Sequence, residues 1–324
     1  MTSTNALPRR ARVADMTLLR VEGKDAVRFL HGQFTNRIEG LRDRVADMTL
    51  LRVEGKDAVR FLHGQFTNRI EGLRDRVVSA GYCSPKGRLL AVLRAWMAAD
   101  GAVMLLLPTS RAAGFLKRMR MYVLRDDVTF TDVTADFTLT LELGAADAPA
   151  AGEAARREDA VLLGLQPTNA VEGFIEAGTR TLVVGPKTED AAEALPFDLW
   201  RVSEIAAGVP QVFESTMEAF VPQQINLELV GGVVFNKGCY PGQEVVSRLQ
   251  HIGETPRRGA IVMLATAEAP APGTLLEAAD AVVVDAVSNG KETLAFVCAK
   301  VAGIPEGAAK TLPLPYEIRN VLKG

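Results

Sequence analysis

The sequence contains one long segment twice in tandem. Val45–Arg76 repeats Val13–Arg44 without a single change. Each copy reads as a strand, MTLLRVEG, followed by a helix that begins near KDAVRFLHGQFTNRI. Solenoid proteins bury a continuous core only with about three or more repeats, which normally diverge. Two identical copies therefore indicate either a recent tandem duplication or an error in assembling the sequence. In both cases two segments compete for one strand–helix position.

The second copy is the better candidate for that position. It runs directly into the next structured segment, which begins at Val77. If the first copy filled the position, the second would become a long loop whose closure costs about 3 kcal/mol. We therefore predict that Met48–Ile70 lies in the core and that Met16–Ile38 is supernumerary.

Length and charge narrow the class of protein. The chain has 324 residues, 48% of them hydrophobic, and a formal net charge of −2. This length allows two or three domains with a sizeable core. Because the net charge is close to zero, the protein as a whole creates no strong electrostatic field that would attract nucleic acid or an anionic membrane. No apolar run approaches the ~20 residues needed to span a bilayer. We expect a protein without membrane or direct nucleic-acid contacts, cytoplasmic or in the mitochondrial matrix of a eukaryote; its oligomeric state stays open.

Patterning along the chain predicts an α+β fold followed by a β region. Val77–Pro108 reads as three strands joined by Pro-Lys-Gly and Asp-Gly turns, and a helix and a strand follow. Gly144–Ala160 reads as an exposed connection, and a helix is expected around Glu189–Leu195. Gly259–Gly324 alternates β-branched runs with turn residues, which favours a small β-barrel. The predicted domains are a supernumerary segment 1–44, an α+β region 45–254 and a barrel 255–324.

The cysteines point to one exceptional position. Cys83, Cys239 and Cys298 are odd in number and widely spaced, which argues against a disulfide framework and a self-contained metal site. Cys239 stands just before a helix expected over Pro241–Gln250, where the helix dipole and Lys237 would favour a thiolate. The alternative is a buried structural cysteine that fixes domain packing.

The eight residues Lys237–Glu244, KGCYPGQE, resemble the signature of the YgfZ-type folate-binding proteins, within the superfamily of the glycine-cleavage aminomethyltransferase. The resemblance implies ferredoxin-like units around a folate cleft, with a C-terminal small β-barrel. It also implies tetrahydrofolate or a one-carbon derivative as cofactor, and no permanently bound metal. Further matching segments follow in the same order: VEGKDAVRFLHGQFTNRI, YCSPKGRLLA, YVLRDDVTF, WRVSEIAAGVP and VPQQINLELVGG.

Site residues follow from this resemblance. Cys239 and Lys237 are the implied catalytic pair, and Trp200 falls where the family places an aromatic residue against folate. Ordinary core packing is the alternative for Trp200. A second family aromatic would fall at Met16 or Met48, where this chain has none. The remaining implied cofactor-binding residues are Gly238, Tyr240, Gly242, Gln243, Glu244, Lys86 and Arg88.

Two departures weigh against glycine-cleavage chemistry. The transferases have an aspartate in the hairpin that here reads SPKGRL, and a glutamate at the place of Ala206, although Glu204 is near. A carboxylate is needed to orient the folate amine or move its proton. Lys86 and Arg88 stand in that hairpin instead. They pair with a polyglutamate tail or an acidic partner, or else they are solvated turn cations.

The leading hypothesis is a folate-binding accessory factor for assembling or repairing iron–sulfur clusters, with Cys239 as its working residue. Its partners would be iron–sulfur client or assembly proteins, including radical enzymes that modify tRNA. The alternatives are a folate-dependent one-carbon transferase or demethylase, and a non-catalytic scaffold.

Two weaker features remain. Arg118–Asp127, RMRMYVLRDD, fits nucleic-acid binding or an amphipathic helix packed on the core, and we favour the core. His251 fits a helix C-terminus better than a partner for the thiol.

Overall fold

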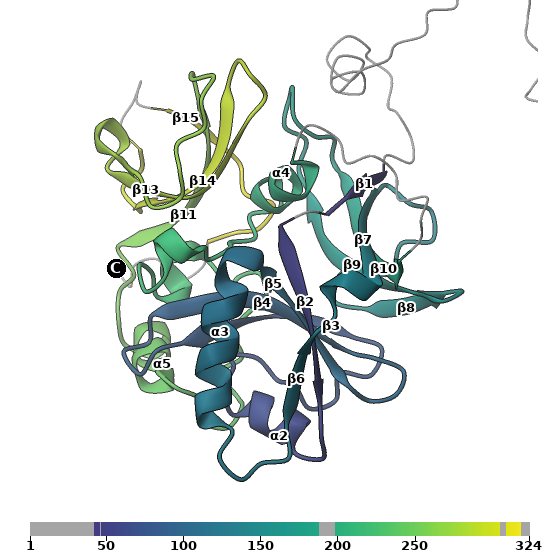
Figure 1. The fold of residues 1–324 in the computed structure, drawn as a ribbon. Coiled ribbons are helices and arrows are strands. Elements are labelled where there is room, and N and C mark those ends of the chain that lie inside the picture. Colours follow the sequence, from purple (N-terminus) through teal and green to yellow (C-terminus); the bar gives the residue numbers. More distant parts are fainter. Residues whose placement is uncertain (1–41, 46, 188–197, 305–308, 319–324) are drawn as a thin grey trace, which may run out of the picture.

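The computed structural model describes residues 42–45, 47–187, 198–304 and 309–318. These residues form three antiparallel five-stranded sheets around a shared core, and helix α4 (Leu199–Ala206) lies between the second and third sheets (Figure 1). Side chains from all three sheets and from α4 contribute to one continuous apolar cluster. None of the helices in the described part of the chain is long and apolar enough to cross a membrane.

The first sheet has two buried faces. Its strand order is β3-β4-β5-β2-β6. On β2, Leu50 joins the shared central core, and its neighbour Leu51 joins a second core under the helices α2 and α3. Alternation of side chains along a strand produces this division. The elements are β2 (Met48–Glu54), α2 (Ala58–His63), β3 (Val77–Cys83), β4 (Leu89–Met97), β5 (Val103–Pro108), α3 (Thr109–Tyr122) and β6 (Thr129–Asp132).

The three strands expected within Val77–Pro108 are confirmed, but α2 is shorter than expected. It ends at His63, and Gly64 caps it. Phe66 then forms a bridge with Tyr82 on β3, so the chain leaves the helix to join the sheet. Burial of Phe66 beneath α3 outweighs the helical pattern of the residues that follow Gly64.

The second sheet has the order β1-β7-β10-β9-β8. The expectation of a connection without regular structure over Gly144–Ala160 is wrong at its end. There β8 and β9 form a hairpin through Glu158 and Asp159, and Glu158 has φ 53°, which the sequence does not signal with a glycine. The helix expected around Glu189–Leu195 lies outside the described residues. The strands are β1 (Arg42–Arg44), β7 (Phe137–Leu143), β8 (Ala154–Arg157), β9 (Ala160–Thr168) and β10 (Gly178–Pro186).

The third sheet is formed by the C-terminal region and has the order β12-β13-β14-β11-β15. The strands β12 and β15 are its two edges, so the described strands form an open sheet and the expected closed barrel is not confirmed. Alternating short strands and turns predict sheet content well, but closure depends on pairing between distant edges. The strands are β11 (Arg257–Leu264), β12 (Leu275–Leu276), β13 (Ala281–Ser288), β14 (Thr293–Lys300) and β15 (Lys310–Leu312).

The second copy of the repeat supplies β2 and α2, and β2 lies inside the first sheet between β5 and β6. Met16–Ile38 lies outside the described residues. The last residues of the first copy, Arg42–Arg44, pair with β7, whereas Arg76 at the end of the second copy bridges to Glu153. The same sequence therefore contacts the second sheet at two places. The domain boundaries predicted at 44/45 and 254/255 remain predictions.

Paired substitutions test which copy occupies the sheet. Deleting either copy would give the same polypeptide, so point variants are needed. We expect Leu51→Ala to lower the free energy of unfolding by about 2–5 kcal/mol, because Leu51 is fully buried. The matched variant Leu19→Ala in the first copy should leave it unchanged. Urea unfolding measures both, and equal losses, or no loss for Leu51→Ala, would show that the copies exchange.

Candidate functional site

The KGCYPGQE segment is held in place by Lys237. Its ammonium donates hydrogen bonds to the backbone carbonyls of His63 at 2.5 Å, Phe66 at 2.6 Å and Asn68 at 3.1 Å. The Tyr240 ring centroid lies 5.3 Å from the same nitrogen. Burial lowers the pKa of Lys237 to about 8. Lys237 therefore ties the motif to the end of α2, and all three protons of the charged amine point at protein carbonyls.

Cys239 is exposed, whereas Cys83 and Cys298 are buried. The predicted accessibility of Cys239 is confirmed, but the helix that follows begins two residues later than expected. The helix α5 runs over Gln243–His251 with Gly242 as its N-cap, so Pro241 precedes the helix and is not its first residue. A side chain at Gly238 would meet nothing within 4 Å, so open space adjoins the thiol. The loop thus presents Cys239 outward from a fixed base, and its catalytic role with Lys237 stays a prediction.

Gly242 packs against the Pro-Lys-Gly turn of the first sheet. Gly242 has φ 79°, and a Cβ there would lie 2.4 Å from the Ser84 carbonyl oxygen and 2.6 Å from Gly87 Cα. Gly87 has φ 72°, and a Cβ on it would lie 2.8 Å from Val245 Cβ. Only two glycines in left-handed backbone can approach this closely. The motif and the SPKGRL hairpin therefore form one packed unit.

The other implied folate-site residues are spread around this unit. Gln243 is half-buried. Glu244 is exposed and forms an ion pair with Arg248 at 3.4 Å within α5. Lys86 is exposed on the turn that Gly242 contacts. Arg88 donates to the backbone carbonyls of Glu218 at 3.2 Å and Ala219 at 2.9 Å, so it braces that neighbouring loop.

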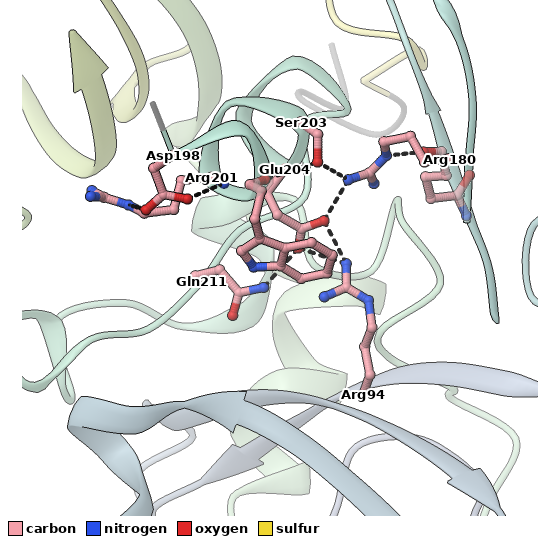
Figure 2. Close-up of polar contacts among 9 residues, drawn as sticks. Arg94, Arg180, Asp198, Arg201, Ser203, Glu204 and Gln211 are labelled. Atoms are coloured by element: carbon pink, nitrogen blue, oxygen red, sulfur yellow. Dashed lines mark hydrogen bonds and ion pairs between the residues drawn. The ribbon is translucent and has the colours of Figure 1, made fainter. Parts of the chain in front are cut away.

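A buried ion cluster lies at the junction of the first sheet, the second sheet and α4. Glu204 of α4 accepts hydrogen bonds from Arg94 of β4 at 2.6 and 2.7 Å, from Arg180 of β10 at 2.6 Å and from Gln211 at 2.8 Å (Figure 2). Burial opposes ionisation of Glu204, but the two guanidinium groups outweigh it and hold its pKa below the usual range. Two cations share one carboxylate, so the cluster carries surplus positive charge.

Trp200 lies beside this cluster and is buried. Only 3% of it is exposed, and the Arg94 guanidinium carbon lies 4.9 Å from its ring centroid. This distance is typical of a cation–π contact. The buried Trp200 ring thus packs against the Arg94 guanidinium. Direct stacking of Trp200 on folate stays a prediction.

A central cavity of about 260 Å³ opens next to Arg94. Its walls come from β3 and β4 of the first sheet, from β9 and the 151–152 loop of the second, and from the 230–234 loop. Arg76, Arg94, Asn68, Ser79 and Gln166 are its polar lining residues. None of the lining residues in the described part of the chain is an aspartate or a glutamate. Neither Trp200 nor any residue of KGCYPGQE is among the lining residues.

The site residues that sequence reasoning missed are Arg76 and Arg94. A signal for Arg94 was present, because it is the only charge within the apolar strand LLAVLRAWM. Arg180 is likewise buried, and its Nη2 has no hydrogen-bond partner among the described residues. The described ranges hold no group of three or more His, Cys, Asp or Glu side chains arranged to bind a metal ion.

No protein-family model matches the chain. Curated relatives are named tRNA-modifying protein YgfZ: one from Colwellia psychrerythraea is 29% identical over 54% of this chain, and one from Hamiltonella defensa is 29% identical over 74%. A third, from Vibrio vulnificus, is 27% identical over 74% of this chain and 80% of its own length. The matches span 56% and 65% of the first two relatives' lengths.

A solved structure also resembles the chain. The crystal structure of glycine cleavage system aminomethyltransferase T from Bartonella henselae matches with a TM-score of 0.63 and 15% identity, over 91% of this chain and 85% of that one. The resemblance that KGCYPGQE indicated is thus confirmed: the chain is related to YgfZ proteins, and its fold is that of the aminomethyltransferase.

The glycine contact gives a paired prediction. We expect Gly242→Ala to destabilise the protein by more than about 1 kcal/mol, because its Cβ would collide with backbone and its φ is positive. Gly238→Ala should change stability by less than about 0.5 kcal/mol, since its Cβ meets open space. Thermal unfolding compares the two variants. Equal behaviour would contradict the packing of the motif against the hairpin.

The buried cluster gives a second prediction. Glu204→Gln leaves two buried guanidinium groups without a counter-charge, so we expect a loss of about 3–5 kcal/mol in urea unfolding. Glu244→Gln on exposed α5 is the control and should change stability by less than about 0.5 kcal/mol. Because the pKa of Glu204 lies below its ordinary 4.5, its stabilisation is complete above pH 4.5 and is lost as pH falls through the lowered value. A tolerated Glu204→Gln would show that the cluster is not ionised.

Proposed function

We propose that this chain is a tetrahydrofolate-binding accessory factor that supports tRNA modification by assembling or repairing iron–sulfur clusters in client enzymes. Two findings support the proposal: relatives are named as tRNA-modifying proteins, and the fold is that of an aminomethyltransferase. The further steps depend on the residues of this chain.

The central cavity suits an anionic ring compound. Arg76 and Arg94 line it, and the cluster behind Arg94 has two cations for one carboxylate. Folate carries carboxylates that such surplus positive charge attracts. A volume of about 260 Å³ is below the range of ~300–1,000 Å³ for whole-ligand pockets, so part of the molecule would extend outside. When bound, tetrahydrofolate would supply a carrier for one-carbon units.

The residues that line the cavity favour a folate-binding accessory factor over an aminomethyl transferase. Among the described residues, no carboxylate lines the cavity, and Glu204, the nearest candidate from the sequence, is enclosed by Arg94, Arg180 and Gln211. A proton must be moved at the folate amine during aminomethyl transfer. The residues around the cavity hold and orient a folate, and they offer no acid or base for that proton.

Cys239 is the proposed working group toward partners. It is exposed, on a loop that Lys237 anchors through three hydrogen bonds. A rigidly presented thiol with open space at Gly238 suits close approach of an iron–sulfur client or assembly protein. The iron and sulfur would be cargo in transit, in agreement with the expectation of no permanently bound metal.

A substitution at Cys239 tests this proposal. In cells that lack the native protein, we expect Cys239→Ser to fail to restore the activities of iron–sulfur enzymes, while tetrahydrofolate affinity measured on the purified variant is unchanged. Cys298→Ser, which changes a buried thiol, is the control and should restore activity. Full restoration by Cys239→Ser would remove the thiol from the mechanism. Turnover of an aminomethyl or N-methyl donor with tetrahydrofolate would favour a transferase instead.

A further inference from the structure

A second cavity lies on the other face of the first sheet, against α3. Its volume is about 350 Å³, and it shares no lining residue with the central cavity. The floor is formed by Tyr82, Leu90 and Phe115, and the walls are α3 and the loop that contains Glu214, Met217 and Glu218. Neither the folate cavity nor the Cys239 loop uses these side chains.

One stripe of α3 forms the first wall. Gly114, Lys117, Arg118 and Met121 line the cavity, and their spacing places them on one helix face. Gly114 is a glycine inside a helix, where it costs about 1 kcal/mol relative to alanine. Its missing side chain leaves room in this wall. Neither Lys117 nor Arg118 has a carboxylate partner within the described ranges. Arg118 donates hydrogen bonds to the hydroxyl groups of Tyr82 at 3.0 Å and Tyr122 at 3.5 Å, so its guanidinium is held in place while its charge is not neutralised.

The opposite wall is acidic and partly apolar. Glu214 forms an ion pair with Arg111, whereas Glu218 has no cationic partner in the described part of the chain. Glu218 has φ 59°, an unfavourable backbone conformation for a residue with a side chain. A backbone hydrogen bond to Leu89 and the bracing by Arg88 hold it there. Met217 is 39% exposed and Met121 on the facing wall is 68% exposed.

These walls fit a ligand with three properties: a flat apolar ring for the two thioethers, N–H donors for the Glu218 carboxylate, and negative charge for Lys117 and Arg118. We propose that this cavity binds a nucleotide of single-stranded RNA, with the base inside and the adjacent phosphates on the two cations. Carboxylates accept hydrogen bonds from base amino groups, and RNA proteins commonly recognise unpaired bases by stacking. A peptide of aspartate and glutamate residues supplies negative charge and backbone N–H donors, but it has no flat ring to pack against the two thioethers.

The neighbouring surface extends this site. The sequence favoured core packing for Arg118–Asp127, and Met119 is indeed buried, but Tyr122 is 45% exposed and Leu124 is 86% exposed. The Arg118 guanidinium carbon lies 5.7 Å from the Tyr122 ring centroid. An exposed aromatic ring beside an arginine is a stacking platform for a second base. In this proposal the helix end contacts a strand of RNA, which differs from the expectation of no direct nucleic-acid contact drawn from the sequence.

Fluorescence anisotropy with a labelled single-stranded RNA of about 12 nucleotides tests the proposal. We expect wild-type protein to bind at low salt with a Kd of about 10⁻⁶–10⁻⁴ M. Lys117→Ala and Arg118→Ala should each weaken binding. Each should also make the slope of log K against log[salt] shallower by about 0.7, because each removes one phosphate contact. Met121→Ala should weaken binding about fivefold or more without changing that slope, since it removes stacking. Lys291→Ala, an exposed cation on the third sheet, is the control.

Further measurements separate the alternatives. The Lys117, Met121 and Lys291 variants should keep the wild-type melting temperature, whereas Arg118→Ala also removes a hydrogen bond to the buried Tyr82 hydroxyl and should lower it. All variants should keep the tetrahydrofolate affinity, because the described lining residues of the two cavities do not overlap, so failure here leaves the proposed folate function standing. The proposal is overturned if wild type does not bind the RNA at about 100 µM, or if Lys291→Ala weakens binding as much as Lys117→Ala. Equal binding of polyglutamate would assign the surface to acidic proteins. Displacement of the RNA by one equivalent of tetrahydrofolate would make it a folate site.

Discussion

The structure depends on one fully buried carboxylate, Glu204, held between Arg94 and Arg180. The three residues come from α4, the first sheet and the second sheet, so no element of the trio can shift without leaving a buried charge unpaired. A buried ion pair is a weak source of net stability, because desolvation offsets the attraction, but its loss is costly. Its main effect is to fix orientation: it fastens α4 across two sheets and leaves surplus positive charge at the wall of the central cavity.

A second set of contacts couples the reactive loop to the same frame. Lys237 anchors KGCYPGQE to the end of α2, and Gly242 is packed against Gly87 in the turn before β4. The strand β4 begins two residues after Gly87 and also carries Arg94, so the loop and the ion cluster are attached to the same sheet. Because α2 belongs to the duplicated segment, the second copy of the repeat is part of this frame, which explains why one copy must occupy the sheet.

Local sequence signals predicted much of this arrangement. The turns of Val77–Pro108, the presence of α5 and the exposure of Cys239 follow from residues close together in the chain, although α5 begins at Gln243 and not at Pro241. The contacts that define the site do not. Arg94 and Glu204 are 110 positions apart, and Lys237 finds its carbonyl acceptors more than 160 positions away. A lone arginine in an apolar strand signals a buried partner without saying which one. Closure of the C-terminal sheet likewise depends on distant edges, and the pattern of short strands could not decide it.

We propose that surplus positive charge in the cavity between the first two sheets binds reduced folate. Isothermal titration of tetrahydrofolate into wild-type protein, Arg76→Ala and Arg74→Ala tests it most directly. Arg76 lines the cavity, and Arg74, which is also exposed and lies two residues earlier, is not among its described lining residues. The account predicts that wild type and Arg74→Ala bind alike and that Arg76→Ala binds about tenfold more weakly, the loss of roughly one charge-assisted hydrogen bond. Equal affinities in all three proteins, or no binding at all, would contradict it.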